Sequence, residues 1–279
     1  MKISVITTLC NAVQTIDDCL DAMAAQSHAD REHLVIDGDS TDGTLERLQR
    51  RRDQLGVLVS EPDGGIYFGL NKGLALATGE VIGILHSDDL YADTEVLARV
   101  ARAFADPAVQ ALYGDLVYVA ADDTRRVIRH WRAGAFRPQR LRWGWMPPHP
   151  TLFLRRSVYE RVGVFDTGYR IAADYDLMLR VLSQLEGPLE GPGDGQGDRH
   201  EQGPEHRQGR VVYVPEVLVR MRLGGKSNRN LKQIAQKSWE DYQILRRQGL
   251  GGPPGTGPLG ALSALAWKNL SKLPQFVRR

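Results

Sequence analysis

Strand-like and helix-like segments alternate over the first 105 residues, and this alternation constrains the fold more than any other feature. Short apolar runs bounded by polar turn residues are typical of buried strands, whereas apolar residues three or four apart are typical of helices. The predicted strands are residues 3–8, 33–37, 57–60 and 81–85. The predicted helices are residues 15–26, 41–52, 69–77 and 94–105. Because a βαβα order favours a parallel sheet with helices on both faces, we expect an α/β fold with a doubly wound, mostly parallel sheet.

The second half of the chain is less regular and predicts a smaller, mixed part. A hairpin is expected from strands at 111–120 and 124–131, which turn at Ala121-Asp122-Asp123. The remaining predicted elements are an extended segment at 211–222, a strand at 151–155, and helices at 157–162 and 172–183.

Two stretches rich in Gly and Pro divide the rest of the chain. Residues 187–210 are almost devoid of apolar side chains and cannot bury a core, so they are predicted to form a disordered surface insert. Residues 249–260 are predicted to be a linker. We therefore expect a main domain over 1–230 and a C-terminal helical tail over 231–279.

The tail contains a short helix with one apolar face and lysines beside it. The residues concerned are Leu262, Leu265, Ala266, Leu270 and Leu273, flanked by Lys268 and Lys272. Such a helix either lies on an anionic membrane surface or packs against the domain. One short helix does not decide between these two interpretations.

Two adjacent aspartates, Asp88 and Asp89, follow the apolar strand at 81–85. Ligands of open α/β sheets bind beyond the carboxyl ends of the strands. Two carboxylates there repel each other, and a divalent cation would compensate them while also carrying substrate phosphates. The other Asp-Asp pairs, at 17–18 and 122–123, are expected to be solvated. Because Asp88 and Asp89 follow a buried strand, this pair is the candidate for binding a nucleotide diphosphate.

Polar motifs also follow the other predicted strands. They are Thr7-Thr8-Leu9-Cys10-Asn11, the run from Asp37 to Thr44, and the run from Glu61 to Tyr67 with Asn71-Lys72 after it. Asp37 could accept a hydrogen bond from a base or a sugar, and Lys72 could reach a phosphate. The motif after the first predicted strand lacks the Gly-x-Gly-x-x-Gly loop of dinucleotide-binding folds and the Gly/Lys loop of P-loop enzymes, which argues against a dehydrogenase, a kinase or a GTPase.

Asp174 and Asp176 stand at the start of a predicted helix. The helix dipole favours carboxylates there, so capping alone could account for both. Because residues two apart on a helix point in different directions, we expect one to face a cleft and the other to cap or to pair with Arg180.

Charge and cysteine content limit the partners and the compartment. The net charge is +2, yet residues 125–161 contain ten arginines and one acid, which suits either an anionic partner or a solvated hairpin. Its aromatic residues match no RNA-binding motif, so nucleic acid is not expected. Two cysteines, no signal peptide and no membrane-spanning apolar run predict a cytoplasmic protein, soluble or peripheral on the inner face of the cell membrane.

The ordered set of motifs resembles glycosyltransferase family 2, in particular the bacterial members that assemble extracellular polysaccharides and O-antigens. The resemblance runs from Lys2 to about Arg229, with the insert as an interruption. The segments that carry it are Ser-Val-Ile-Thr-Thr, Val-Ile-Asp-Gly-Asp-Ser-Thr-Asp-Gly-Thr, Asp-Gly-Gly-Ile-Tyr, Asn-Lys-Gly-Leu-Ala-Leu-Ala-Thr-Gly-Glu, His-Ser-Asp-Asp and Ala-Asp-Tyr-Asp-Leu-Met-Leu-Arg.

This resemblance implies a GT-A fold, with a Rossmann-like nucleotide-binding half and a smaller mixed acceptor-binding half, and inverting transfer from a nucleotide sugar, most simply a UDP-sugar. It implies Asp174 as the catalytic base, Asp89 as the ligand of Mg²⁺ or Mn²⁺, and a lipid-linked or glycan acceptor. The implied donor-site residues are Thr7, Thr8, Asn11, Asp37, Asp39, Gly64, Asn71, Lys72 and Asp88. The residues expected to border the acceptor or diphosphate are His149, Gly225 and Ser227.

The sequence departs from the family pattern at three positions. Relatives usually carry an acidic residue at Phe68, Gly at Asp39 and an acid at Ala173, so the substrate details are in doubt rather than the reaction class. No apolar run reaches membrane-spanning length, unlike in processive synthases, which favours addition of a single sugar. Two alternatives are a sugar nucleotidyltransferase, whose early Gly-rich loop is missing here, and a non-catalytic scaffold that recruits enzymes to a membrane.

Overall fold

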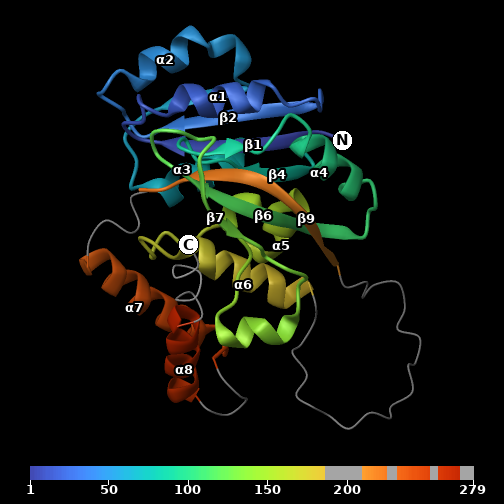
Figure 1. Cartoon of the computed structure of the whole chain (residues 1–279), viewed down its shortest axis with the longest axis vertical. Coiled ribbons are helices and arrows are strands. Elements are labelled where there is room, and N and C mark those ends of the chain that lie inside the picture. Colours follow the sequence, from blue (N-terminus) through green and yellow to red (C-terminus); the bar gives the residue numbers. More distant parts are fainter. Residues whose placement is uncertain (186–208, 225–230, 252–256, 271–279) are drawn as a thin grey trace.

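The computed structural model describes residues 1–185, 209–224, 231–251 and 257–270, and within them the chain forms an α/β fold around one curled, mixed sheet (Figure 1). The strand order is β3-β2-β1-β4-β8-β6-β9-β5, and β7 pairs with β6. The strands are β1 (Ile3–Leu9), β2 (Arg31–Asp37), β3 (Val57–Ser60), β4 (Val81–Ile84), β5 (Leu90–Tyr91), β6 (Val109–Val119), β7 (Val127–Trp131), β8 (Phe153–Arg155) and β9 (Arg210–Arg222). The helices are α1 (Ile16–Ala24), α2 (Thr44–Arg50), α3 (Ile66–Leu76), α4 (Val96–Phe104), α5 (Arg156–Val162), α6 (Ala173–Leu185), α7 (Leu231–Arg247) and α8 (Gly257–Leu270). Short 3₁₀ turns occur at η1 (Arg52–Gln54), η2 (Pro138–Trp143) and η3 (His149–Thr151).

The first four strands of this order pair in parallel, as the βαβα alternation predicts. Leu9 lies opposite Asp37, and Asp37 lies opposite Ser60, so β1, β2 and β3 end at the same edge of the sheet. The arrows of β1 and β2 point to this edge in Figure 1. Polar residues that follow these strands are thereby brought together.

The other part of the sheet is mixed. β8 pairs antiparallel with β4 and β6, whereas β6 and β9 are parallel. The predicted hairpin is confirmed, since β6 and β7 pair antiparallel and Asp122 is exposed at their turn. β5 follows Asp89 directly and pairs with β9, so β9 fixes the segment that carries the two aspartates.

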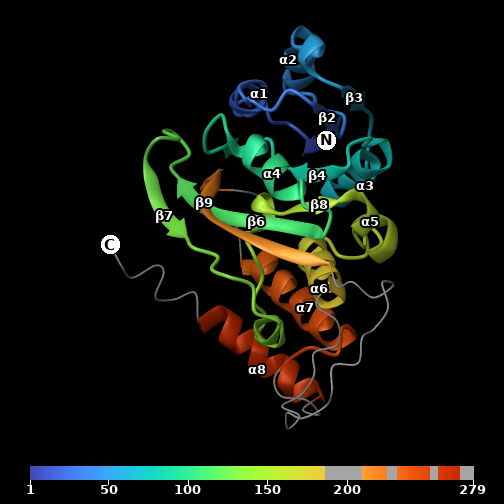
Figure 2. The same ribbon diagram turned by 90° about the vertical axis from the view of Figure 1, so that its right-hand side faces the viewer.

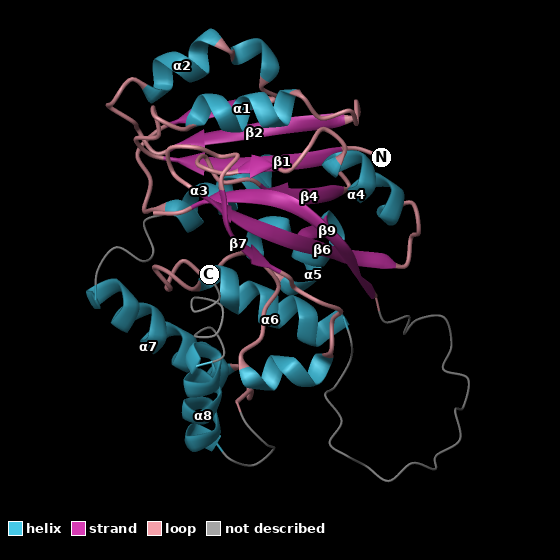
Figure 3. Ribbon diagram, viewed as in Figure 1, coloured by secondary structure: helices cyan, strands magenta, loops and turns pink. Residues whose placement is uncertain are grey.

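Alternate side chains of β1 face two helical layers, which lie on opposite faces of the sheet (Figure 3). Ile3 and Val5 belong to the core closed by α1, α2 and α4. Ile6 belongs to the core closed by α3, α5 and α6. Because strand side chains alternate with a period of two, one short apolar strand serves both cores.

Two helices begin where a glycine adopts positive φ rather than at the predicted residue. α2 starts at Thr44, after Gly43 with φ 95°, and α3 starts at Ile66, after Gly65 with φ 119°. The left-handed region is accessible to glycine without steric cost, so the chain can turn sharply there. The helix predicted at 41–52 is therefore shorter in the structure, because α2 begins at Thr44. The helix predicted at 69–77 is longer, because α3 begins at Ile66.

The C-terminal helices pack on the rest of the protein, with α7 beside α6 and α8 below them (Figure 2). On α8, Ala261 and Ala264 are fully buried in a core shared with α6 and α7. Lys268 is buried too: its Nζ lies 2.9 Å from Asp241 Oδ2 and over the ring of Tyr175. The described part of α8 thus packs against the domain, and Lys268 is not on a solvent-facing basic flank.

Several boundaries predicted for this region differ from those in the structure, and others lie outside the described residues. Arg210 belongs to β9, so the insert predicted over 187–210 ends earlier, and its residues 187–208 lie outside the described part. α8 begins at Gly257, inside the predicted linker. Lys272 and Leu273 are not described. Among the described residues, no helix has the length and apolar character needed to cross a bilayer.

A buried histidine in the sheet should make stability depend on pH. Thr7 donates to the Leu85 carbonyl (2.7 Å), so its oxygen accepts from His33 Nε2 (2.8 Å). Burial lowers the pKa of His33 to about 4. The unfolded chain, with a pKa near 6.5, binds the proton first as pH falls, so stability is full above about pH 6.5 and is lost between there and about pH 4.

We expect His33→Gln to reduce this loss. The difference in free energy of unfolding between about pH 7.5 and about pH 5 should shrink by roughly 2 kcal/mol relative to the wild type. Urea unfolding of both proteins at the two pH values measures this difference. An unchanged difference would show that His33 does not titrate as its burial requires.

Candidate functional site

Asp37 organises the edge where β1, β2 and β3 end. It is fully buried, and its Oδ2 accepts hydrogen bonds from the Ser40 backbone N–H (3.1 Å) and the Ser60 hydroxyl (2.6 Å). The Ser40 hydroxyl donates to the other oxygen. Three donors satisfy a buried charge that would otherwise be costly, and together they fix the turn after β2.

The turns after β1 and β2 are joined to each other. Asn11 and Asp39 adopt positive φ, at 56° and 62°. Asn11 donates its backbone N–H to Ser40 Oγ (2.8 Å) and accepts from the Thr41 N–H through Oδ1 (2.9 Å). Asp39 is exposed at this junction. Asn11 therefore holds the two loops in register, and Asp39 is the acid that solvent or a ligand can reach.

Thr8 and Asp63 lie close to Gly69 of α3, and Asp63 also lies close to Gly38, the residue after Asp37. A Cβ on Gly38 would lie 3.3 Å from Asp63 Oδ1, and one on Gly69 would lie 3.1 Å from Thr8 Cγ2 and 3.2 Å from Asp63 Oδ2. Thr8 is buried, and within the described part of the chain its hydroxyl has no hydrogen-bond partner. A buried hydroxyl without a partner costs free energy unless a ligand or water satisfies it. We call Thr8, Asn11, Asp37, Asp39 and Asp63 the strand-end group.

Sequence reasoning assigned no role to two residues of this region, although the run from Glu61 to Tyr67 that it selected contains Asp63. Ser60 and Asp63 stand at and just after the carboxyl end of β3, where the same rule that selected Asp37 applies. The short run Glu61-Pro62-Asp63 resembles an ordinary turn, and only the register of β3 against β2 reveals its position.

The two adjacent aspartates have different surroundings. Asp89 is 1% exposed, and its Oδ1 accepts from the Arg222 backbone N–H (3.2 Å). Burial, and then the charge of Asp88, raise the pKa of Asp89 well above its usual range. Asp88 is only partly buried. The carboxylate that a ligand reaches first is therefore that of Asp88.

The pair fits a divalent cation. Asp89 Oδ2 is buried and has no hydrogen-bond partner among the described residues. Hard cations prefer carboxylate oxygens, and Mg²⁺ in nucleotide sites takes one or two of them with substrate phosphates completing the shell. The described residues contain no group of three or more His, Cys, Asp or Glu side chains that could hold a metal unaided. Asp88 and Asp89 would therefore hold a metal only together with a phosphate-bearing ligand.

Asp174 meets residues from three other segments. Its Oδ1 accepts from the Tyr67 hydroxyl on α3 (3.3 Å), and its Oδ2 lies 3.8 Å from His149 Nδ1 on η3. The rings of His149 and His86 are 5.3 Å apart. The charges of Asp88 and Asp174 both act on the two histidines. We call His86, Asp88, His149 and Asp174 the carboxylate–histidine group.

Burial disfavours the charged form of both histidines in this group. Burial lowers the pKa of His149 to about 4, against the opposing effect of Asp174. Burial also lowers the pKa of His86. Neither imidazole then neutralises the nearby carboxylates. A negative site of this kind attracts a cation or a group that brings one.

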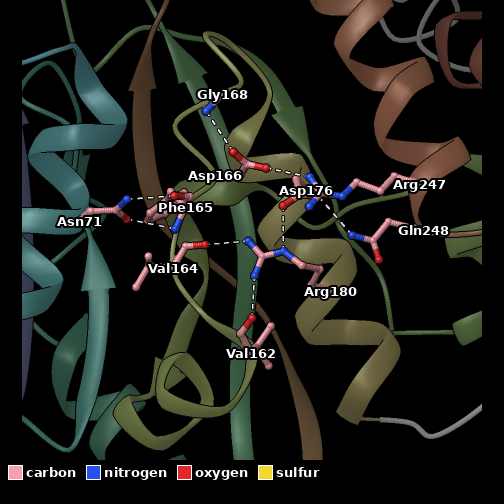
Figure 4. Close-up of polar contacts among 10 residues, drawn as sticks. All are labelled: Asn71, Val162, Val164, Phe165, Asp166, Gly168, Asp176, Arg180, Arg247 and Gln248. Carbon is pink, nitrogen blue, oxygen red and sulfur yellow. Dashed lines mark hydrogen bonds and ion pairs between the residues drawn. The ribbon is translucent and has the colours of Figure 1, made fainter.

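The predicted pairing of one of these two aspartates with Arg180 is confirmed. Asp176 is buried, and it accepts from Arg180 Nε (2.8 Å) and Gln248 Nε2 (3.1 Å), as Figure 4 shows. Asp174 has 26% of its side chain exposed. Asp176 is thus a structural carboxylate, and Asp174 is the accessible one.

Several predicted site residues are engaged elsewhere. Thr7 lies in the core, bound to His33 and Leu85. Asn71 uses both ends of its amide on the backbone of Phe165, at 2.9 and 3.0 Å (Figure 4). Lys72 pairs with Glu61.

Gly64 is the one remaining candidate within the described part of the chain. Gly64 lies under the ring of Phe68, since a Cβ there would be 2.6 Å from that ring. Gly225 and Ser227 lie outside the described residues.

The arginine-rich stretch is partly used within the protein. Arg125 and Arg126 pair with Asp123 and Asp122 in the hairpin turn. Arg155 donates to the backbone carbonyls of Phe104, Asp106 and Val109. These arginines do not form one continuous basic surface.

Solved structures share this fold. TarS from S. aureus in complex with UDP has a TM-score of 0.62 at 18% identity, and the match covers 100% of this chain and 73% of that one. The mannosyltransferase PcManGT from Pyrobaculum calidifontis, in complex with GDP-Man and Mn²⁺, has a TM-score of 0.62 at 20% identity, covering 98% and 72%. At these identities the likeness concerns the fold, which is that of GT-A glycosyltransferases.

Sequence relatives point the same way. A PGL/p-HBAD biosynthesis glycosyltransferase of Mycobacterium bovis is 32% identical over 184 residues, which is 64% of this chain and 69% of that protein. The O-antigen biosynthesis protein RfbC of Myxococcus xanthus is 30% identical over 193 residues, covering 64% of this chain and 14% of the larger protein. The family model described as "Glycosyl transferase family 2" matches residues 4–163. That match spans more than half of the chain and includes the strand-end group and Asp88, so this protein is a glycosyltransferase of family 2.

Proposed function

We propose that this enzyme is an inverting glycosyltransferase that moves one sugar from a nucleotide-diphosphate sugar to an acceptor hydroxyl. The observation that carries the proposal is the convergence of Asp174 with His86, Asp88 and His149, although Asp174 lies far along the chain from Asp88. This convergence supports a partly exposed catalytic carboxylate near a candidate phosphate and metal site. Family membership argues against the two alternatives, a sugar nucleotidyltransferase and a non-catalytic scaffold.

The proposed donor is a nucleotide sugar, with a UDP-sugar as first choice. Structures of TarS were solved with UDP and with UDP-GlcNAc, and that of PcManGT with GDP-Man, which supports a nucleotide sugar as the ligand here. In this chain the Thr8 hydroxyl and the Asp63 carboxylate would face the base and ribose, and Asp39 would be within reach of the sugar hydroxyls. Lys72 would reach a phosphate only by leaving Glu61.

A divalent cation, Mg²⁺ or Mn²⁺, would be held by Asp88 and by Asp89 Oδ2. When bound, it would neutralise the negative charge that develops on the leaving diphosphate. Because Asp89 is buried, we propose that Asp88 supplies the solvent-accessible carboxylate oxygen to the metal and that Asp89 supplies the buried one. The mannosyltransferase neighbour was solved with Mn²⁺, which supports a divalent metal in this fold.

Asp174 is proposed to take the proton from the acceptor hydroxyl as that oxygen attacks the anomeric carbon on the face opposite the diphosphate. The new bond forms as the bond to the diphosphate breaks, so the configuration inverts. The Tyr67 hydroxyl, which donates to the Ile171 carbonyl, lies 3.3 Å from Oδ1, and this leaves Oδ2 for the acceptor beside the neutral imidazole of His149. General base catalysis of this kind contributes about 10²–10⁴-fold.

The proposed acceptor is a lipid-linked or glycan hydroxyl. The names of the relatives, in PGL/p-HBAD and O-antigen biosynthesis, support a role in assembling surface glycans. We propose peripheral attachment at the inner face of the membrane through the outer side of α8, where Leu259 is 76% and Leu262 is 50% exposed. Lys268 would take no part in this attachment, because it is buried against Asp241.

Replacing Asp174 tests the base. We expect Asp174→Asn to lower kcat by about 10²–10⁴-fold and to leave donor binding unchanged, since the amide cannot accept a proton but has the same shape. Steady-state kinetics and calorimetric titration with the donor give the two quantities. Asp122→Asn, at the exposed hairpin turn, is the control for loss of one acidic residue. Normal turnover in Asp174→Asn would remove Asp174 from this role.

A thermal-shift panel of nucleotides with and without Mn²⁺ tests the donor and metal sites. A ligand that binds only the folded state stabilises it by about 2.7 kcal/mol at a concentration of about 100 times Kd. We expect one nucleoside diphosphate to raise Tm and Mn²⁺ to increase that rise. Asp88→Asn should abolish the part that depends on Mn²⁺, whereas Asp122→Asn should retain it. Failure of every nucleotide to raise Tm would refute the donor site.

A further inference from the structure

A carboxylate from the C-terminal tail binds the backbone that leads into Asp174. Glu240, in the middle of α7, is 5% exposed. Its Oε1 accepts from the Arg170 N–H (3.1 Å), and its Oε2 accepts from the N–H groups of Ile171 and Ala172 (both 2.9 Å). Gln236, one turn earlier on α7, donates to Oε1 (3.0 Å). One side chain therefore holds three consecutive backbone amides at the start of α6.

The residue before α6 has no side chain that caps the helix. The first N–H groups of a helix have no partner within the helix, and Ser, Thr, Asp or Asn at the preceding position usually satisfies one of them. Here the preceding residue is Ala172, which has no side chain that can do so. Glu240 does not bind those helical N–H groups; it accepts from the N–H of Ala172 and from those of the two residues before it, and so fixes the backbone that enters the helix. Its negative charge is favourable near the positive end of the helix dipole.

The same backbone is held on its other side by α3. The Ile171 carbonyl accepts from the Tyr67 hydroxyl (2.7 Å), and that hydroxyl also lies 3.3 Å from Asp174 Oδ1. Ile171 thus binds Glu240 through its N–H and Tyr67 through its C=O. The position of Asp174, three residues later, depends on both contacts.

Further contacts from the end of α7 hold the approach to α6. Arg247 pairs with Asp166 (2.8 Å), and Gln248, just after α7, donates to Asp176 (3.1 Å), as Figure 4 shows. From the opposite side Asn71 binds the backbone of Phe165, next to Asp166. The loop before α6 is therefore fixed between α3 and the C-terminal helices.

We propose that Glu240 is a positioning residue for Asp174, and that α7 is part of the catalytic unit rather than an appendage. The inference rests on the proposed role of Asp174 as the base. Glu240 touches neither substrate nor Asp174; it acts through the backbone of residues 170–172. A displacement of about 1 Å in a reacting group can cost about 10²-fold in rate, so loss of this anchor should lower kcat more than it lowers donor binding.

The neighbouring residue provides a matched control. Asp241 is also a buried carboxylate on α7, but its Oδ2 binds Lys237 (3.0 Å) and Lys268 (2.9 Å). These hydrogen bonds lie within α7 and between α7 and α8, and they do not involve residues 170–172. Asp241→Asn removes a buried charge from the same helix and so measures the cost of disturbing α7 alone.

The experiment compares Glu240→Gln, Asp241→Asn and Asp174→Asn in the full chain, well below their melting temperatures. In Glu240→Gln the new side-chain amide offers one acceptor oxygen in place of two, so at least one backbone N–H loses its partner. Amide hydrogen exchange of residues 170–172 reports the anchor without any substrate. Release of nucleoside diphosphate from the donor that the thermal-shift panel identifies gives kcat and donor KM.

For Glu240→Gln we expect faster exchange at residues 170–172, kcat lower by about 10- to 100-fold and donor KM unchanged. Asp241→Asn should lower Tm with unchanged kcat and unchanged exchange at those amides. The positioning role would be overturned if Glu240→Gln and Asp241→Asn lowered kcat equally. It would also be overturned if Glu240→Gln kept residues 170–172 protected and kept a normal kcat. Normal kcat in Asp174→Asn would instead overturn the assignment of the base, so the two failures are distinguishable.

Discussion

Parallel pairing of β1 with β2 and β4, and of β2 with β3, is the constraint on which the candidate site depends. Parallel strands in register end at one edge, where backbone groups and short polar side chains of successive loops are close enough to bond. Asp37 binds Ser40 and Ser60 there, and Asn11 binds the loop after β2. A slip of one residue would exchange the faces of a strand and separate these partners. The register therefore positions the strand-end group before any ligand contributes.

Solvent exposure differs between carboxylates that look equivalent in the sequence. Asp88 and Asp89 are adjacent, and Asp174 and Asp176 are two apart, yet in each pair one member is buried and held by the protein, and the other is reachable. A buried carboxylate needs donors, which Arg222 supplies to Asp89, and Arg180 and Gln248 supply to Asp176. The accessible members, Asp88 and Asp174, converge on the same two histidines. The buried partners hold the accessible ones in place.

The predictions from sequence succeeded where local pattern decides and failed where distant segments meet. The predicted strands, the β6–β7 hairpin and the pairing of one of the two aspartates on α6 with Arg180 follow from periodicity and spacing, and the structure confirms them. Thr7 and Asn71 matched a family motif, but their polar groups are satisfied by His33, Leu85 and Phe165. Whether a polar residue is available to a ligand depends on what packs against it, and no local pattern contains that information. Lys268 shows the same point, since a lysine beside an apolar helix face is buried against Asp241.

The sequence by itself determined the α/β class, the family and the identity of the acidic residues at the strand ends, because strand and helix periodicities and strand-end motifs are local properties of the chain. Only the tertiary structure decided which acids are reachable, that Ser60 and Asp63 join the strand ends beside Asp37, and that Glu240 binds the backbone that leads into the helix carrying Asp174. These facts depend on contacts between segments distant in sequence, such as α7 with the start of α6. Such contacts form because buried charges and helix ends must find partners, and only the folded chain determines where those partners lie.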